Sequence, residues 1–192
     1  MDRFQLIAKT GELFLVRKAR PEDVEGCLAM ISELVDEKVY ILYDKKPTLE
    51  EERKWLERAM DNIRKGELIH WLVEKDRRIV GGIDASRRPM KMHHTVEIGI
   101  VLLKDARGKG VGEQLIKKMI EAILEQWKEP ILITLGVFEK NERAKALYRK
   151  AGFAKVASYP LWIDHYGELI DLDMMYWKDS PLLRKKGIKL GK

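Results

Sequence analysis

A buried strand that runs into a glycine-rich turn constrains this chain more than any other feature of its sequence. The apolar run 96–103 is followed by the turn 104–112, KDARGKGVG, and by an amphipathic segment, 113–127. Glycines let the backbone turn tightly and approach a ligand closely. The first amides of a helix lack intrahelical partners and lie at the positive end of its dipole. This arrangement suits a phosphate or pyrophosphate group, and Arg107 and Lys109 add positive charge beside it.

The turn by itself also fits an ordinary strand-to-helix loop. A Walker loop ends in Gly-Lys-Ser or Gly-Lys-Thr, whereas Val111 follows Gly110 here. A dinucleotide fingerprint has the spacing Gly-x-Gly-x-x-Gly, whereas Gly108, Gly110 and Gly112 alternate with single residues. The turn therefore matches neither of these phosphate loops.

A second strand and helix follow. Residues 131–138 have the pattern of a buried strand. Residues 142–150 have the pattern of a helix, with Asn141 suited to its N-cap and Gly152 to its C-terminal end. Asn141 and Tyr148 are seven positions apart, which places them on one face of that helix.

Together the two segments resemble the motifs of the GNAT superfamily of acetyl-CoA-dependent N-acyltransferases. The first motif is Arg107-x-x-Gly110-x-Gly112, and the second is Asn141-x-x-Ala144-x-x-Leu147-Tyr148-x-Lys150-x-Gly152-Phe153. The resemblance implies an α+β fold with a mixed central sheet of about seven strands flanked by four helices. In this fold two strands splay apart, and the pantetheine arm of the coenzyme lies in the gap.

The periodicity along the rest of the chain predicts elements in a matching order. Thr48 and Glu51 form a capping box that starts one helix, and Pro21 suits the first turn of another. The expected strands are 12–17, 68–74, 78–85, 95–103, 131–138, 155–161 and 169–176, and two further helices are expected at 113–127 and 142–150.

The resemblance also implies roles for single residues. Coenzyme phosphates would be bound by the turn residues Arg107, Gly108, Lys109, Gly110, Val111 and Gly112. Asn141 would reach the coenzyme as well as cap its helix. Backbone N–H groups near the splayed strand would stabilise the oxyanion, and they belong to Ile100, Val101 and Leu102. The hydroxyl of Tyr148 would point at the thioester sulfur; the alternative is an aromatic ring that only packs beside Leu147.

Acyl transfer to an amine also needs a base, because an alkyl ammonium group has a pKa of roughly 10. Glu97 lies on the strand before the turn, where many GNAT enzymes carry an acid. The alternative is an exposed strand glutamate paired with a lysine, and a bulge in the strand would change its direction. Bacterial ribosomal-protein alanine acetyltransferases carry a glutamate five positions before the asparagine, where this chain has Gly136.

Other polar residues are weaker candidates for the acceptor side. His93 and His94 precede the strand of Glu97, and His165 and Tyr166 lie in a terminal hairpin that flanks the acceptor in related enzymes. Four acids could attract a cationic amine or could be solvated: Glu12, Asp36, Glu37 and Asp44. No His, Cys or acid cluster has metal-ligand spacing, so we expect no metal.

Composition limits the remaining classes. The chain has 192 residues, of which 45% are apolar, as in a single globular domain. Cys27 is the single cysteine, so no internal disulfide framework is possible, and its place on an apolar helix face indicates a packing residue. No apolar run reaches the roughly eighteen residues of a membrane span. The N-terminus has no signal-peptide core, so we expect a cytoplasmic protein.

The formal charge of +6 does not by itself indicate nucleic-acid binding. From Lys178 onward there are six basic residues and one acid, a net +5, which leaves +1 for residues 1–177. We therefore expect residues 1–177 to form the acetyltransferase domain and residues 178–192 to form a basic tail.

These observations predict an N-acetyltransferase that moves an acetyl group from acetyl-CoA to a primary amine. The acceptor could be a protein or peptide amine, a polyamine, an amino acid or a related small amine. The alternative is a non-catalytic acyl-CoA-binding regulatory module. The sequence leaves open the acceptor, the base, the role of the tail and whether the chain forms a homodimer.

Overall fold

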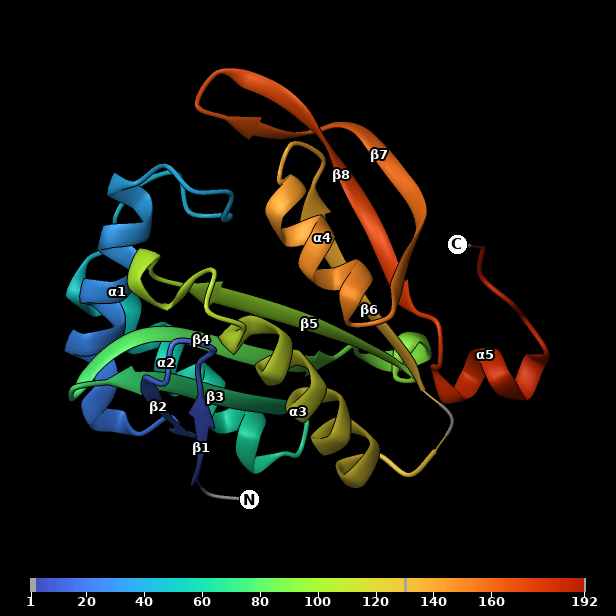
Figure 1. Cartoon of the computed structure of the whole chain (residues 1–192), viewed down its shortest axis with the longest axis horizontal. Coiled ribbons are helices and arrows are strands. Elements are labelled where there is room, and N and C mark those ends of the chain that lie inside the picture. Colours follow the sequence, from blue (N-terminus) through green and yellow to red (C-terminus); the bar gives the residue numbers. More distant parts are fainter. Residues whose placement is uncertain (1–2, 130, 192) are drawn as a thin grey trace. The chain divides into compact units, whose positions relative to one another are not determined.

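The computed structural model describes residues 3–129 and 131–191, which form an α+β fold (Figure 1). Within these residues, eight strands are hydrogen-bonded in the order β1-β2-β3-β4-β5-β6-β8-β7. The strands are β1 (Arg3–Ile7), β2 (Leu13–Lys18), β3 (Leu68–Lys75), β4 (Arg78–Arg87), β5 (Thr95–Leu102), β6 (Leu132–Phe138), β7 (Phe153–His165) and β8 (Glu168–Trp177). The helices are α1 (Val24–Asp36), α2 (Leu49–Arg64), α3 (Val111–Gln126), α4 (Glu142–Lys150) and α5 (Pro181–Lys186). The predicted fold class is confirmed.

The chain forms two compact units. The N-terminal unit contains the residues up to Asp84 together with Ile100–Leu115. The C-terminal unit contains Ala85–Gly99 and the residues from Ile116 onward. Strand β5 and helix α3 therefore each contribute residues to both units.

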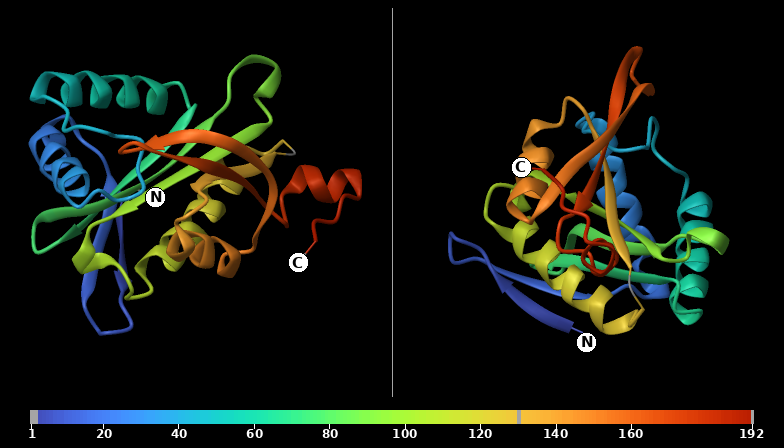
Figure 2. Two further views of the ribbon diagram at one scale, coloured as in Figure 1. Left: turned by 90° about the horizontal axis from the view of Figure 1, so that it is seen from above. Right: turned by 90° about the vertical axis from the view of Figure 1, so that its right-hand side faces the viewer.

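Antiparallel strands and two packed helices build the N-terminal unit. β1 pairs with β2, and β2 pairs with β3 from Leu15↔Glu74 to Lys18↔Trp71. Helix α2 begins at the predicted capping box. The Glu51 amide donates to Oγ1 of Thr48 (3.2 Å), and the Thr48 amide donates to Oε2 of Glu51 (2.7 Å). Figure 2 shows α2 beside α1, where the apolar face of α2 is buried.

The C-terminal unit contains the parallel strand pair of the sheet. β5 pairs with β6 from Thr95↔Leu132 to Glu97↔Thr134. β6 continues antiparallel to β8 as far as Phe138↔Leu172, and β8 forms a long hairpin with β7. Figure 1 shows this hairpin extending past α4 and β6. Within the described part of this unit, the β5–β6 register ends after Glu97, which agrees with strands that splay apart.

Two elements, β1 and α5, were not predicted from the sequence. α5 begins at Pro181 and ends before Gly187, which adopts φ +67°, and Leu183 on this helix is buried. The amide of Leu182 also donates to the carbonyl oxygen of Ile131 (3.0 Å). Part of the segment expected as a basic tail is therefore packed on the C-terminal unit, while Lys192 lies outside the described residues.

None of the helices in the described ranges is both long and apolar enough to cross a membrane.

Candidate functional site

The predicted turn joins β5 to α3 in the N-terminal unit. A single turn of 3-10 helix, η3 (Lys104–Ala106), follows β5, and α3 starts at Val111. Gly108 and Gly110 adopt φ of +77° and +81°, the left-handed region that favours glycine. The carbonyl of Gly110 accepts the first helical hydrogen bond, from the Gln114 amide (3.3 Å). The preceding amides of α3 have no intrahelical acceptors, so the turn fits a phosphate group.

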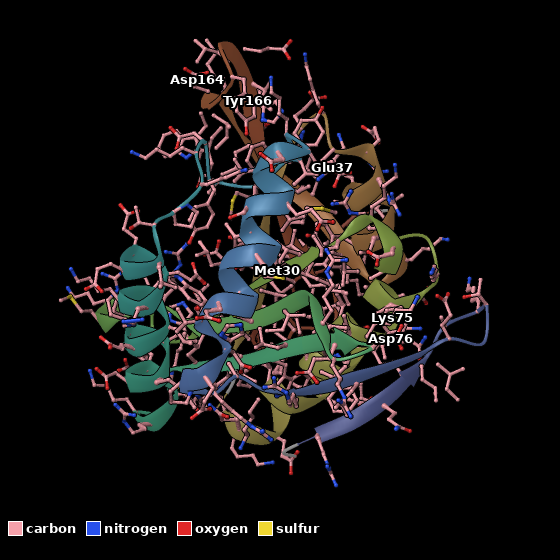
Figure 3. All side chains as sticks on the ribbon, turned by 90° about the vertical axis from the view of Figure 1, so that its left-hand side faces the viewer. Met30, Glu37, Lys75, Asp76, Asp164 and Tyr166 are labelled. Carbon is pink, nitrogen blue, oxygen red and sulfur yellow. The ribbon has the colours of Figure 1, made fainter. Side chains whose placement is uncertain are left out.

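Arg107 is held by acceptors of the same unit. Its Nε donates to the carbonyl oxygen of Leu102 (2.6 Å). Its terminal nitrogens donate to the two carboxylate oxygens of Glu37 (2.5 and 2.8 Å), which follows the end of α1 (Figure 3). A carboxylate therefore offsets the charge that the sequence suggested for phosphate binding, and Arg107 connects the turn to α1.

Lys109 is also paired with an acid. Its Nζ donates to Glu12 (2.7 Å), which accepts from Lys75 as well; Figure 3 labels Lys75 at the turn between β3 and β4. The ammonium of Lys109, followed by that of Lys75, lowers the pKa of Glu12 from 4.5 to about 2. Glu12 thus binds cations of its own chain. Two other acids proposed to attract an amine also pair with cations of this chain. Glu37 pairs with Arg107, and Oδ2 of Asp36 lies 2.7 Å from Nζ of Lys46.

Lys9 is a residue at the turn that the sequence analysis missed. Its amide donates to the carbonyl oxygen of Lys109 (3.0 Å). Its side chain runs over Gly110, where a Cβ atom would lie 3.2 Å from Cε of Lys9. Nε2 of Gln114 donates to the carbonyl oxygen of Ile7 (2.9 Å) and fixes this segment to α3. No sequence signal pointed to Lys9, because it lies about a hundred positions from the turn.

Asn141 and Tyr148 lie on α4 in the C-terminal unit. Oδ1 of Asn141 accepts from the Ala144 amide (3.1 Å), so the predicted N-cap is confirmed. Lys145, a buried residue between Asn141 and Tyr148 in the sequence, fixes α4 to β8. Its Nζ lies 2.6 Å from Glu142 and 3.8 Å from the buried Asp173 of β8. The predicted C-terminal glycine, Gly152, adopts φ +92°.

The side chain of Tyr148 is 7% exposed and packs near Phe153, with ring centroids 6.2 Å apart. Burial raises the pKa of its hydroxyl from 10.0 to about 12. The group therefore stays protonated at neutral pH and is available as a hydrogen-bond donor. The neighbouring Leu147 is only half-buried.

Glu97 lies on the accessible face of β5, at the last residue paired with β6. Its neighbours Val96 and Ile98 are buried, whereas the side chain of Glu97 is 34% exposed. Its carboxylate forms an ion pair with Arg88. The sequence suggested a lysine as the partner of an exposed glutamate here, whereas the partner is an arginine, and the carboxylate still contacts solvent.

The other candidate side chains are dispersed. Nδ1 of His93 lies 2.9 Å from the carbonyl oxygen of Met90, and its ring is 5.8 Å from that of His94. His165, at the end of β7, contacts Phe138 at the end of β6 and Tyr166 in the turn of the β7–β8 hairpin. Cys27 is buried, as predicted, and burial raises the pKa of its thiol to about 12. Among the described residues, no group of three His, Cys or acidic side chains is arranged to hold a metal ion.

A model of the acetyltransferase (GNAT) family matches residues 29–153. The matched range contains the glycine turn, Glu97 and the motif on α4. It covers well over half of the chain.

Two known N-acyltransferases are similar to this chain. The L-amino acid N-acyltransferase MnaT of Escherichia coli K12 is 28% identical over 82 residues, which are 43% of this chain and 46% of that relative. The chain thus matches about half the length of this curated relative. The ribosomal-protein-alanine N-acetyltransferase structure from Brucella melitensis is 25% identical with a TM-score of 0.73, over 84% of this chain and 97% of that chain.

An acetyl-CoA complex is among the similar structures. YncA from Salmonella typhimurium, solved with its cofactor acetyl-CoA, has a TM-score of 0.72 over 85% of this chain and 92% of that chain. Its identity is 19%, so this likeness concerns the fold alone.

Proposed function

Because this chain belongs to the acetyltransferase (GNAT) family, we propose that it moves an acetyl group from acetyl-CoA to a primary amine. The observation that carries the proposal is that one family match covers both the glycine turn and the Asn141–Tyr148 helix. Two of the similar proteins described above are named for their acceptor, which is an amino acid in one case and a ribosomal-protein alanine in the other. We extend only their shared chemistry, an amine acceptor, to this chain.

The glycine turn is the proposed binding site for the coenzyme phosphates. Its support is the positive φ of Gly108 and Gly110 and the start of α3, where the first amides lack intrahelical acceptors. Val111 and Gly112 supply the amides of the first helical turn. Arg107 and Lys109 would keep the turn in shape through Glu37 and Glu12, rather than act as free cations. Lys9 has no ion pair in the described part of the chain and would add an accessible ammonium group.

The amine must lose its proton before it attacks the thioester carbonyl. Glu97 is the proposed base, acting directly or through water, because its carboxylate contacts solvent and Arg88 orients it. The backbone N–H groups of Ile100, Val101 and Leu102 are the proposed oxyanion donors. The departing thiolate takes a proton or a hydrogen bond from the hydroxyl of Tyr148. Where Tyr148 gives up its proton, that proton balances the one that Glu97 takes from the amine, and exchange with solvent returns both side chains to their starting states. Where Tyr148 gives only a hydrogen bond, coenzyme A leaves as the thiolate and the proton from the amine passes to solvent.

A non-catalytic acyl-CoA-binding module is the other candidate. It would need the turn but would have no use for a protonated hydroxyl at position 148. Burial keeps the Tyr148 hydroxyl protonated, and none of the hydrogen bonds within the described residues engages it. This favours the enzyme, because a donor without a protein partner can bind a developing thiolate.

Acetyl-CoA is expected to stabilise the fold. A ligand at about a hundred times its dissociation constant adds about 2.7 kcal/mol to the free energy of unfolding. Thermal melts with acetyl-CoA, and with NAD and ATP as controls, measure this effect. A melting temperature that does not move with millimolar acetyl-CoA or CoA would count against the proposed function.

A further inference from the structure

The β7–β8 hairpin carries an apolar surface that the fold leaves exposed. We call it the hairpin patch; it consists of Tyr159, Leu161, Trp162 and Leu169, which are 44%, 63%, 65% and 57% exposed. The rings of Tyr159 and Trp162 lie 5.3 Å apart and are tilted by 38°. Exposed apolar patches that include a large aromatic side chain mark interaction sites more often than isolated apolar residues do.

A bulge in the outermost strand keeps this patch turned outward. The register moves from Tyr159↔Leu172 to Ile163↔Ile170, so residues 160–162 of β7 lie opposite the single residue Asp171. Leu161 adopts φ +53°, which is uncommon for a bulky side chain. Oδ1 of Asp171 accepts a hydrogen bond from the Leu161 amide (2.9 Å). The sheet therefore ends in a deformed edge that presents Leu161 and Trp162.

The charge of the hairpin differs from that of the rest of the chain. Residues 156–177 contain four acids and neither lysine nor arginine, in a chain with 37 lysines and arginines. Glu168 pairs with Lys140, and Asp173 pairs with Lys155. The other two acids are Asp164 and Asp171.

Asp164 and Asp171 have no cationic partner within the described residues. Oδ1 of Asp164 accepts from the Gly167 amide (2.7 Å), and Asp171 accepts from the Leu161 amide. Figure 3 shows Asp164 at the tip of the hairpin. Two uncompensated carboxylates therefore lie on the hairpin that carries the exposed tryptophan and tyrosine rings.

We propose that the hairpin patch, with Asp164 and Asp171, binds a polypeptide segment rich in lysine or arginine. Cationic side chains would lie over the faces of Trp162 and Tyr159 and would pair with the two carboxylates. Charge complementarity selects this partner, because an acidic or uncharged apolar segment would leave the carboxylates unpaired. The inference does not depend on acetyl transfer, since binding at the hairpin needs no coenzyme.

The test is the affinity for a dye-labelled peptide of alternating arginine and serine. Its amino end is blocked and no acetyl-CoA is present, so binding is separated from catalysis. The parent is expected to bind this peptide, more weakly as salt rises, and not to bind the same peptide with glutamate in place of arginine. Trp162→Ala is expected to weaken binding about two- to fivefold, the effect of one exposed cation–π contact.

Removal of both charges gives the second variant. The double variant Asp164→Asn, Asp171→Asn keeps the oxygens that accept the Gly167 and Leu161 amides, so the bulge is retained. It is expected to weaken binding about three- to tenfold, as two exposed ion pairs would. Asp179→Asn is the matched control, because this exposed acid lies outside the hairpin, and its affinity is expected to equal that of the parent.

Three results would overturn the inference. The first is a glutamate peptide that binds as tightly as the arginine peptide. The second is an affinity for the arginine peptide that neither hairpin variant changes. The third is a parent protein that forms a dimer while the hairpin variants are monomers. The third would assign the patch to a second copy of this chain. Failure of acetyl-CoA to bind would instead reject the proposed function and leave the patch intact.

Discussion

Gly110→Asp is expected to lower the affinity for acetyl-CoA by about a hundredfold or more, while the protein without coenzyme stays folded. Gly110 adopts φ +81°, and its Cβ position lies 3.2 Å from the Lys9 side chain, so a larger residue is strained there. A carboxylate at the start of α3 would also repel the pyrophosphate that we propose binds there. Isothermal titration of parent and variant with acetyl-CoA measures the difference.

Gly66→Asp is the matched control. Gly66 follows α2 with φ +72°, and among the described residues no atom beyond its immediate chain neighbours lies within 4 Å of its Cβ position. The control introduces similar backbone strain and the same charge away from the turn, so its coenzyme affinity is expected to equal that of the parent. Equal affinity in Gly110→Asp and in the parent would reject this turn as the phosphate site.

Tyr148→Phe is expected to reduce turnover at least tenfold with little change in acetyl-CoA affinity. The substitution removes only the hydroxyl, so the packing against Phe153 is kept. Burial raises the pKa of the hydroxyl to about 12, and in the proposed mechanism it would act mainly as charge develops on sulfur. General acid catalysis contributes about 10²–10⁴-fold, so a tenfold loss is a low threshold. Steady-state kinetics with a known acceptor and direct coenzyme titration separate the two effects.

Two companion variants sharpen this prediction. Tyr159→Phe removes a hydroxyl from an exposed tyrosine of the hairpin and is expected to leave turnover on a small amine unchanged. Glu97→Gln keeps the shape of the proposed base. Its loss of activity relative to the parent is expected to be greatest at low pH, where the amine is protonated. Parental turnover in a Tyr148→Phe variant that still binds coenzyme would make Tyr148 a packing residue.

Local features of the fold and of the candidate site were predictable from the sequence because their partners are a few positions apart. Asn141 caps α4 through the Ala144 amide, and Thr48 forms its capping box with Glu51, each over three positions. Gly110 has a positive φ, and a glycine at such a turn indicates this because glycine adopts positive φ more readily than other residues. These contacts need no knowledge of the tertiary fold.

The electrostatics of the turn were not predictable, because the partners are distant in sequence. Arg107 meets Glu37 across 70 positions, and Lys109 meets Glu12 across 97. Residue types alone indicated two free cations, whereas the fold gives each a carboxylate. The direction of Glu97 also required the fold, since a strand places a residue on either face until its partners are known.

The lengths of the elements show the same limit. β7 was expected over 155–161 but runs from Phe153 to His165, because the bulge opposite Asp171 lets the strand continue past Pro160. Proline is tolerated there because β7 lies at the edge of the sheet. β1 and α5 have five and six residues, too few for a clear periodicity.

The most direct test of the central claim is acetyl transfer itself. The purified protein is incubated with acetyl-CoA and a panel of primary amines that includes amino acids, polyamines and peptides with a free N-terminus. We predict that free coenzyme A appears in proportion to an N-acetylated product identified by mass spectrometry, for at least one amine class. The opposite result is acetyl-CoA that binds while no amine of the panel is acetylated, whether or not free coenzyme A appears. That result would contradict the proposed acetyl transfer and favour a non-catalytic module.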